Sequence, residues 1–324
     1  MFHMREASGK ICAQYANFIN GGMRVKKVFK WVGIGLGSLI GLILLLAVVF
    51  YFIGNSRLNK KYEIPSSNIT LPSDSVSIEF GKHRAEVLCE GCHGSDLSGI
   101  DNWFNAPPLG NIDSANLTSG EGGVGAEFTT EDYVRAIRHG INREGKPIFM
   151  IAVPSTAHLS DEDLGAIIAY VKTVPPVDHT VRERHFTPLA KILLAAGVLG
   201  KLPAETVSHD VHVTAPAPGA TADYGEYLIN TNDCRVCHGQ NLNGGSYPDP
   251  TITKTSPNLT PGGELSAWSE DKFINTIRTG KTPGGHELNP DFMPWKYYRL
   301  FYDDELQAIW LYLQSLPKLP QYTE

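Results

Sequence analysis

The chain has 324 residues, of which 42% are hydrophobic and 19% are charged, a length that suits two ordinary domains or one large one. Its net charge of −6 is spread unevenly, because residues 1–61 carry nine basic side chains and one acidic one, whereas the other 263 residues carry 19 basic and 33 acidic ones, a balance of −14. An acidic folded part excludes nucleic-acid binding, which requires a basic stripe. It suits either encounters with a basic partner or simple solubility.

The first predicted element is a transmembrane helix at residues 31–53, an uninterrupted run without a charged side chain. A helix of that length crosses a bilayer core of roughly 30 Å. Aromatic residues near its ends and basic residues on both flanks fit a membrane span with the N-terminus inside. We expect an uncleaved signal anchor in the cytoplasmic (inner) membrane. The alternative is a cleaved signal peptide, whose apolar region would be shorter.

The rest of the chain contains one pattern twice. Each copy has an aromatic-Gly start, a C-x-x-C-H-G motif and two later segments with apolar residues at helical spacing. No long alternating strand pattern occurs in either copy. We therefore predict a mostly α fold, with an N-terminal transmembrane helix followed by two small all-α domains in tandem. The matching segments are residues 80–99 with 224–244, 128–140 with 268–280, and 159–176 with 302–318.

These patterns divide the chain into six predicted parts. The interdomain part, residues 177–222, contains an apolar stretch, which is either a helix that packs on a domain or one that rests on the membrane surface. A Pro/Ala-rich linker follows this stretch. In the first part, Met23 is an alternative start of the protein. The parts are a tail at 1–30, the anchor at 31–53, a linker at 54–73, a first domain at 74–176, the interdomain segment at 177–222 and a second domain at 223–324.

The two cysteine motifs carry the chemistry. Two thiols in one helical turn can add to the vinyl groups of a haem, and the histidine that follows can ligate the iron. A redox dithiol would not require that histidine, and a zinc site would require a second ligand pair. Because the histidine is present in both copies, we predict two covalently bound haem c groups. The residues are Cys89, Cys92 and His93 in the first copy, and Cys234, Cys237 and His238 in the second.

On these motifs the chain resembles the class I-like cytochrome c family, in its membrane-anchored tandem di-haem form. The resemblance covers residues 80–176 and 224–317. It implies a few helices wrapped round each haem, with the first and last helices crossing near an aromatic residue. It also implies haem attachment on the periplasmic, extracytoplasmic side. The positions that match the crossing are Gly81 with Tyr170 and Gly225 with Tyr312.

The resemblance further implies a methionine as the sixth iron ligand, late in each domain. Met150 follows His93, and Met293 follows His238, at nearly the same distance along the chain. The alternative for each is a methionine that fills the core. Pro294 follows Met293 as the family pattern requires, whereas Ile151 follows Met150, which departs from it. The alternative ligands are His139 and His158 in the first domain and His286 in the second.

Further candidate haem contacts lie outside the cysteine motifs, and some of them repeat between the copies. Arginines in matching I-R-x-G positions are candidates for haem propionate contacts or ordinary exposed helix residues. Asparagines in matching N-L-T turns are candidate haem contacts, and two tryptophans are expected to pack on the haems. These residues are Arg138 and Arg278, Asn116 and Asn258, and Trp103 and Trp268.

Filled axial positions leave no site for oxygen or peroxide, so we predict an electron carrier without catalytic residues, with two low-spin, fairly high-potential centres. Its partners would be redox proteins of the membrane or periplasm. One alternative is the cytochrome subunit of a larger membrane oxidoreductase, either a dehydrogenase or a terminal oxidase. Another is an enzyme in its own right, a di-haem peroxidase or thiosulfate-oxidising cytochrome.

Overall fold

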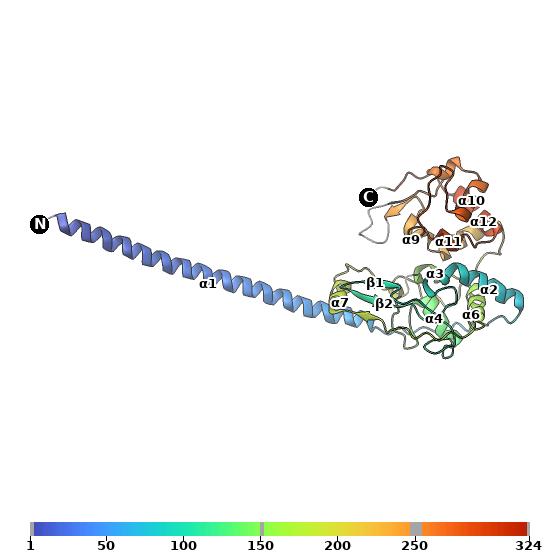
Figure 1. Cartoon of the computed structure of the whole chain (residues 1–324), viewed down its shortest axis with the longest axis horizontal. Coiled ribbons are helices and arrows are strands. Elements are labelled where there is room, and N and C mark those ends of the chain that lie inside the picture. The colour runs from blue at the N-terminus through green and yellow to red at the C-terminus, as the bar shows by residue number, and fades with distance from the viewer. Residues whose placement is uncertain (1–2, 150–151, 247–254, 323–324) are drawn as a thin grey trace. The chain divides into compact units, whose positions relative to one another are not determined.

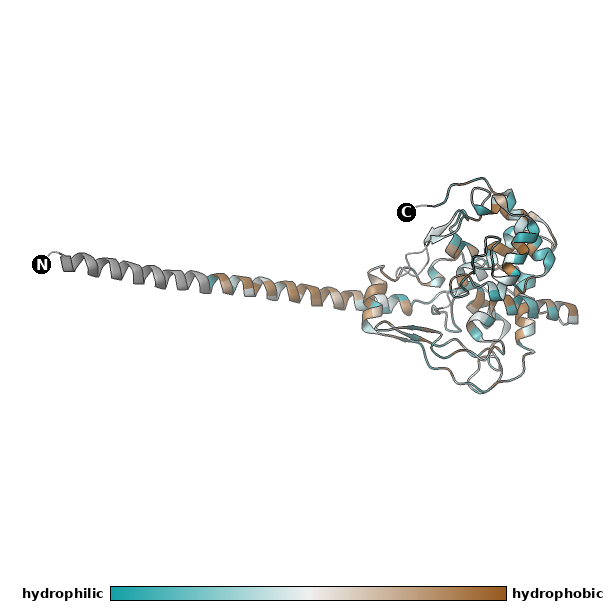
Figure 2. Ribbon diagram, turned by 45° about the horizontal axis from the view of Figure 1, so that its top comes forward, coloured by the Kyte–Doolittle hydropathy of each residue, from teal (hydrophilic) through white to brown (hydrophobic). Residues whose placement is uncertain are grey.

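A computed structural model of the chain describes residues 3–149, 152–246 and 255–322, with side chains from residue 27 onward. Its first element is helix α1, His3–Leu58, which contains the predicted span and continues beyond it on both sides (Figure 1). The extension has a simple cause, because no proline occurs before Pro65. Among the described residues, Lys27–Leu58 is the one helical stretch long and apolar enough to cross a membrane, and Figure 2 shows its hydrophobic colouring.

The interdomain apolar stretch forms helix α7, Pro188–Ala195. Its residue Lys191 packs on the end of α1 so closely that a Cβ added to Gly54 would overlap the Lys191 carbonyl. Lys191 Nζ also donates a hydrogen bond to Asn55 Oδ1 (2.9 Å), and Arg57 donates to the carbonyl of Leu194. This part of the segment is therefore a packing helix, and its partner is α1.

The first copy of the repeat is mainly helical. Short antiparallel strands in the order β1-β2-β3 accompany its helices. The elements are α2 (Ser75–Leu88), α3 (Glu90–His93), β1 (Phe104–Ala106), β2 (Gly110–Ile112), α4 (Thr130–His139), α5 (Val153–Thr156), α6 (Asp161–Val171) and β3 (His185–Phe186).

The second copy repeats the helices of the first. A 3₁₀ turn, η1 (Pro203–Glu205), lies between the copies. The predicted mostly α fold is confirmed. The elements are α8 (Ala222–Thr231), α9 (Cys234–His238), β4 (Gly245–Ser246), β5 (Thr255–Ser256), η2 (Glu264–Ala267), α10 (Glu270–Thr279), α11 (Trp295–Tyr298) and α12 (Asp303–Ser315).

Side-chain caps fix where several of these helices begin. Thr129 and Asp132 form a capping box at the start of α4, and the Ser160 side chain accepts a hydrogen bond from Asp163 N at the start of α6. Helices α4 and α10 both end at a left-handed glycine, Gly140 and Gly280. The two copies therefore set the ends of this helix with the same local signal.

In each copy the first helix crosses the last one at a glycine. A Cβ added to Gly81 in α2 would overlap the carbonyl of Ala166 in α6, and one added to Gly225 in α8 would overlap the carbonyl of Ala308 in α12. Only a residue without a side chain allows this approach. The crossing closes the hydrophobic core behind each cysteine motif, so it positions the site.

Candidate functional site

The second cysteine motif forms the short helix α9, which begins at Cys234 and ends at His238. Both of its cysteines are free and partly buried, as are Cys89 and Cys92 in the first copy. Burial raises the pKa of Cys89 and of Cys234 to about 12, so both thiols are protonated at neutral pH. No group of three or more His, Cys, Asp and Glu residues suited to a metal ion occurs in the part of the chain that the structure describes.

The motif histidines are held in the same way in both copies. His93 Nδ1 lies 2.7 Å from the carbonyl oxygen of Ala115, and His238 Nδ1 lies 2.9 Å from that of Pro257. Because a carbonyl can only accept, Nδ1 carries the proton in each ring and donates it. The other nitrogen, Nε2, is then unprotonated and available to a metal, as is typical of histidine ligands oriented by a backbone carbonyl.

A cavity of about 470 Å³ opens beside α9. Its size lies in the range of roughly 300–1,000 Å³ that is typical of cofactor and ligand sites. Cys234, Cys237 and His238 line it from one element, while Met293 lines it from the segment before α11. Most of the rest of the lining is apolar. The residues present therefore fit a haem, which the two thiols would attach and whose iron His238 and Met293 would ligate.

Met150, the sixth ligand expected in the first copy, lies outside the described residues. Of the alternative ligands, His286 also lines the cavity of the second copy and is exposed. His158 is exposed, whereas His139 is buried, with Nδ1 3.3 Å from His209 Nδ1. Trp268 lines the same cavity as His286.

The two N-L-T turns are closed by the chain that follows each copy's last helix. Asn116 Nδ2 donates to the carbonyl of Val177 (2.8 Å), and Asn258 Nδ2 donates to that of Leu319 (2.7 Å). In both turns the asparagine Oδ1 accepts from the threonine two residues later, Thr118 or Thr260. These asparagines thus organise the turns that supply the histidine-orienting carbonyls of Ala115 and Pro257, and Asn258 also lines the cavity.

The two matching arginines engage groups of the protein itself. Arg138 is fully buried, donates to the carbonyls of Leu159 and Val211 (both 2.8 Å) and pairs with Asp161. Arg278 pairs with Asp303 at 2.6 Å. Contact of either arginine with a propionate stays a prediction.

A family model described as cytochrome c oxidase, cbb3-type, subunit III matches residues 77–171 and 220–313, which together make up more than half of the chain. The chain belongs to this cytochrome c family. The resemblance predicted from the two C-x-x-C-H motifs is confirmed, and the model matches once in each copy.

Several cytochrome subunits are similar to this cytochrome c. The cytochrome c subunit of alcohol dehydrogenase (quinone) from Gluconacetobacter polyoxogenes is 26% identical over 280 residues, covering 78% of this chain and 58% of that protein. The fructose dehydrogenase cytochrome subunit of Gluconobacter japonicus is 27% identical, covering 74% of this chain and 53% of that protein. The gluconate 2-dehydrogenase cytochrome c subunit of Pantoea cypripedii is 28% identical, covering 75% and 60%. This cytochrome c thus spans a little more than half the length of these relatives.

Sequence reasoning missed part of the cavity lining of the cytochrome c. Tyr298 lines it, and its hydroxyl donates to the carbonyl of Asn232 (2.7 Å) just before the cysteine motif. Phe273 and Ile277 of α10 line it as well. Their spacing of four residues marks one face of the helix and could have revealed them. Tyr298 lies in the short helix α11, and the corresponding helix α5 contains no tyrosine, so no repeat indicated it.

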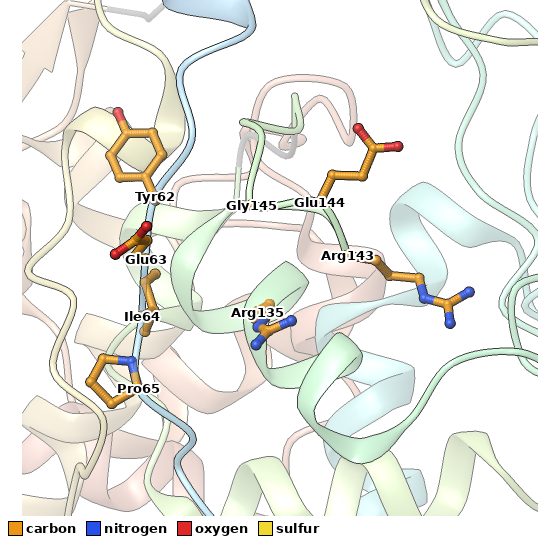
Figure 3. A pocket seen from close by; sticks show the side chains of 8 residues that line it. All are labelled: Tyr62, Glu63, Ile64, Pro65, Arg135, Arg143, Glu144 and Gly145. Atoms are coloured by element: carbon orange, nitrogen blue, oxygen red, sulfur yellow. The ribbon is translucent and has the colours of Figure 1, made fainter.

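A second hollow, of about 540 Å³, lies on the first copy, where the Tyr62 N–H donates to the carbonyl of Gly145 (2.9 Å). Figure 3 shows residues 62–65 as one extended segment and the side chains of Arg143 and Glu144 directed away from it. The lining has two arginines and two glutamates, and it contains no cysteine or motif histidine. This hollow is therefore separate from the haem motifs.

Proposed function

We propose that this cytochrome c is the di-haem electron-transfer subunit of a membrane dehydrogenase. Several similar proteins are named as cytochrome subunits of dehydrogenases, acting on an alcohol, fructose or gluconate by their names. These relatives favour a role as the subunit of a larger dehydrogenase over a role as a free electron carrier. A dehydrogenase partner supplies the substrate chemistry, so the cytochrome needs only to accept and pass on single electrons.

The observation that carries the proposal is the cavity beside α9, where two thiols, a histidine with a free Nε2 and the Met293 thioether converge. When bound, haem supplies an iron that takes up and releases one electron. The protein attaches it through Cys234 and Cys237, orients the His238 ring through Pro257 and surrounds it with apolar side chains. Ligation by the Met293 thioether together with the His238 imidazole would favour the reduced iron and raise its potential. In the first copy Cys89, Cys92 and His93 take the corresponding roles, with Met150 as the proposed partner.

The membrane helix completes the proposal. We infer that α1 anchors the chain in the inner membrane, with both haem domains on the periplasmic side. The uncharged run from Trp31 to Ile53 supports a span, and haem attachment to cysteines supports an extracytoplasmic site. The anchor would keep both haems close to a membrane partner.

Purification of the tagged full-length chain from membranes of its host tests the proposal. We expect two haems per chain by the pyridine haemochrome assay and a larger co-purifying subunit. Addition of that subunit's alcohol or sugar substrate should reduce the haem absorbance. A matched variant, Cys234→Ala/Cys237→Ala, should keep one haem. A chain that purifies alone, with haems that no dehydrogenase substrate reduces, would contradict the subunit role.

A further inference from the structure

The two copies meet through a buried polar layer. Half of its residues lie on the helix just before a cysteine motif, and the other half lie at the start of a copy's last helix. His83 Nε2 donates to Glu305 Oε2 at 2.7 Å, and the His83 ring stacks on Tyr302 with a centroid distance of 3.8 Å. Arg84 Nη1 lies 3.9 Å from Glu305 Oε1. Helix α2 of the first copy thereby holds the start of α12 in the second.

Further bonds join the copies on the other side of Arg84. Tyr227 of α8 donates its hydroxyl proton to Asp163 Oδ2 at 2.8 Å, and the same hydroxyl accepts from Ser160 N at 3.1 Å. Arg84 Nη2 donates to Thr231 Oγ1 at 3.3 Å. The layer therefore draws on the first and last helices of both copies.

Burial makes these contacts depend on one another. The exposed fraction is 0% for Arg84, 2% for Glu305 and 4% for His83. A charge removed from water is tolerated only when partners compensate it, and loss of one partner leaves the other uncompensated. Arg84 has one carboxylate from its own copy, Asp163 at 3.4 Å, and one from the other copy, Glu305. Arg84 therefore gains its second carboxylate only in the docked arrangement.

The contact continues to the cysteine motifs themselves. A Cβ added to Gly91, which lies between Cys89 and Cys92, would be 3.2 Å from the Tyr297 ring of α11. The Ser155 hydroxyl of the first copy donates to the carboxylate of Asp233, the residue before Cys234. Each motif therefore touches, directly or through its neighbour, an element of the opposite copy.

We propose that the buried layer around Arg84 and Glu305 is a positioning device that holds the two C-x-x-C-H motifs at one fixed separation, for electron exchange between their haems within a single chain. This inference rests on the proposed function, since it requires a haem in each copy. The exchange moves one electron from a ferrous to a ferric iron, and it makes or breaks no bond and transfers no proton. Arg84, Glu305 and His83 are positioning residues and do not themselves touch the haems in this scheme.

The test uses the full-length chain in nanodiscs and the variant Glu305→Gln, which keeps a side chain able to cap α12 but removes the charge. The matched control is Asp303→Asn, on the same helix, whose carboxylate is 86% exposed and pairs with Arg278 of its own copy. His83→Phe is the second variant, because it keeps a ring against Tyr302 and removes the bond to Glu305.

Three quantities are measured: amide hydrogen exchange, the concentration-independent rate of electron exchange after flash reduction, and both midpoint potentials. In Glu305→Gln and His83→Phe we expect faster amide exchange in α2 and α11 and unchanged potentials. The electron exchange should slow severalfold, because electron tunnelling between two centres falls steeply as their separation grows. Asp303→Asn should match the wild type.

Two results would overturn the inference. One is unchanged amide exchange in both variants, which would show that the layer does not hold the copies together. The other is opening of the contact without slower electron exchange, which would make the layer structural only. A haem content below two per chain in the wild type would instead refute the proposed function, and the haemochrome assay shows this beforehand.

Discussion

Gly225 and Ala308 lie in contact through their backbones, so that a Cβ on Gly225 would overlap the Ala308 carbonyl oxygen. The same relationship joins Gly81 to Ala166 in the first copy. It sets the crossing of α8 over α12, and the helices can approach this closely only at glycine. The crossing can therefore be tested by adding one methyl group.

We expect Gly225→Ala to lower the free energy of unfolding of the second copy by about 1–3 kcal/mol or more, because the added methyl group forces the two backbones apart. Denaturant unfolding of the full-length chain, followed by haem absorbance, measures this. The control is Gly284→Ala, where the nearest atom to an added Cβ is Thr282 Oγ1 at 3.9 Å, so a change within about 0.5 kcal/mol is expected. Equal effects of the two substitutions would refute the crossing.

Met293→Leu removes a thioether while nearly conserving side-chain volume, so the fold should persist and the sixth ligand should be lost. We expect the second haem to become high-spin when reduced, to bind carbon monoxide and to shift to a lower potential. Optical redox titration measures all three changes. Met150→Leu is the parallel variant for the first haem. A low-spin spectrum that persists in Met293→Leu would mean that another residue ligates the iron, and His286 would be the first to examine.

The buried His139 predicts a pH dependence of stability. Burial first, and then the nearby His209, lowers its pKa to about 4, against an unfolded value of about 6.5. Between these two pKa values the unfolded chain binds a proton at His139, whereas the folded chain does not. The stability contributed by neutral His139 is therefore present above pH ~6.5 and is lost progressively as the pH falls toward about 4.

The variant His139→Phe lacks the stability contributed by neutral His139 and therefore does not lose it at low pH. The difference in unfolding free energy between wild type and variant should become smaller as the pH falls from about 7.5 to about 4.5. Urea unfolding at both pH values measures the difference. His158→Gln, at an exposed position, should instead run parallel to the wild type at every pH. A constant difference for His139→Phe would show that this ring does not titrate as inferred.

A chain shortened to begin after Leu58 lacks α1 and should no longer sediment with membranes, while it keeps both haems when exported with a cleavable signal peptide. Fractionation and haem staining measure this. If the shortened chain still pellets with membranes, a second attachment exists. The segment to test would then be α7 and the residues that follow it, which expose Leu189 and Leu199. If the native chain proves to start downstream of α1, the helix is a cleaved signal and not an anchor.

Much of the fold could be predicted from the sequence because the same pattern of motifs and helical segments occurs in two copies. The periodicity of residues 128–140 and 159–176 predicted α4 and α6, and the matching segments predicted α10 and α12. The crossing glycines were also identified from the family pattern. Their backbone contacts, however, are Ala166 and Ala308, one helical turn before the predicted aromatics Tyr170 and Tyr312, because contact at a crossing depends on the smallest neighbouring residue and not on the largest.

The rest of the site was not accessible in the same way. The carbonyls of Ala115 and Pro257 that orient the histidines are backbone groups, and their role leaves no mark on residue type. His83 and Arg84 look like ordinary charged residues of a surface helix, yet both are buried and both contact residues of the second copy. A pattern within one copy cannot show which face that copy presents to its neighbour.

The segment that follows each last helix ends on the turn beside the metal-facing ring. Leu319 holds Asn258, Asn258 shapes the turn, and the adjacent Pro257 carbonyl aims the His238 imidazole. A fusion or truncation a few residues beyond α12 therefore acts on the turn that orients the His238 ring. We therefore expect a tag joined close behind Gln321 to disturb the orientation of the His238 ring more than a tag joined through a long flexible spacer.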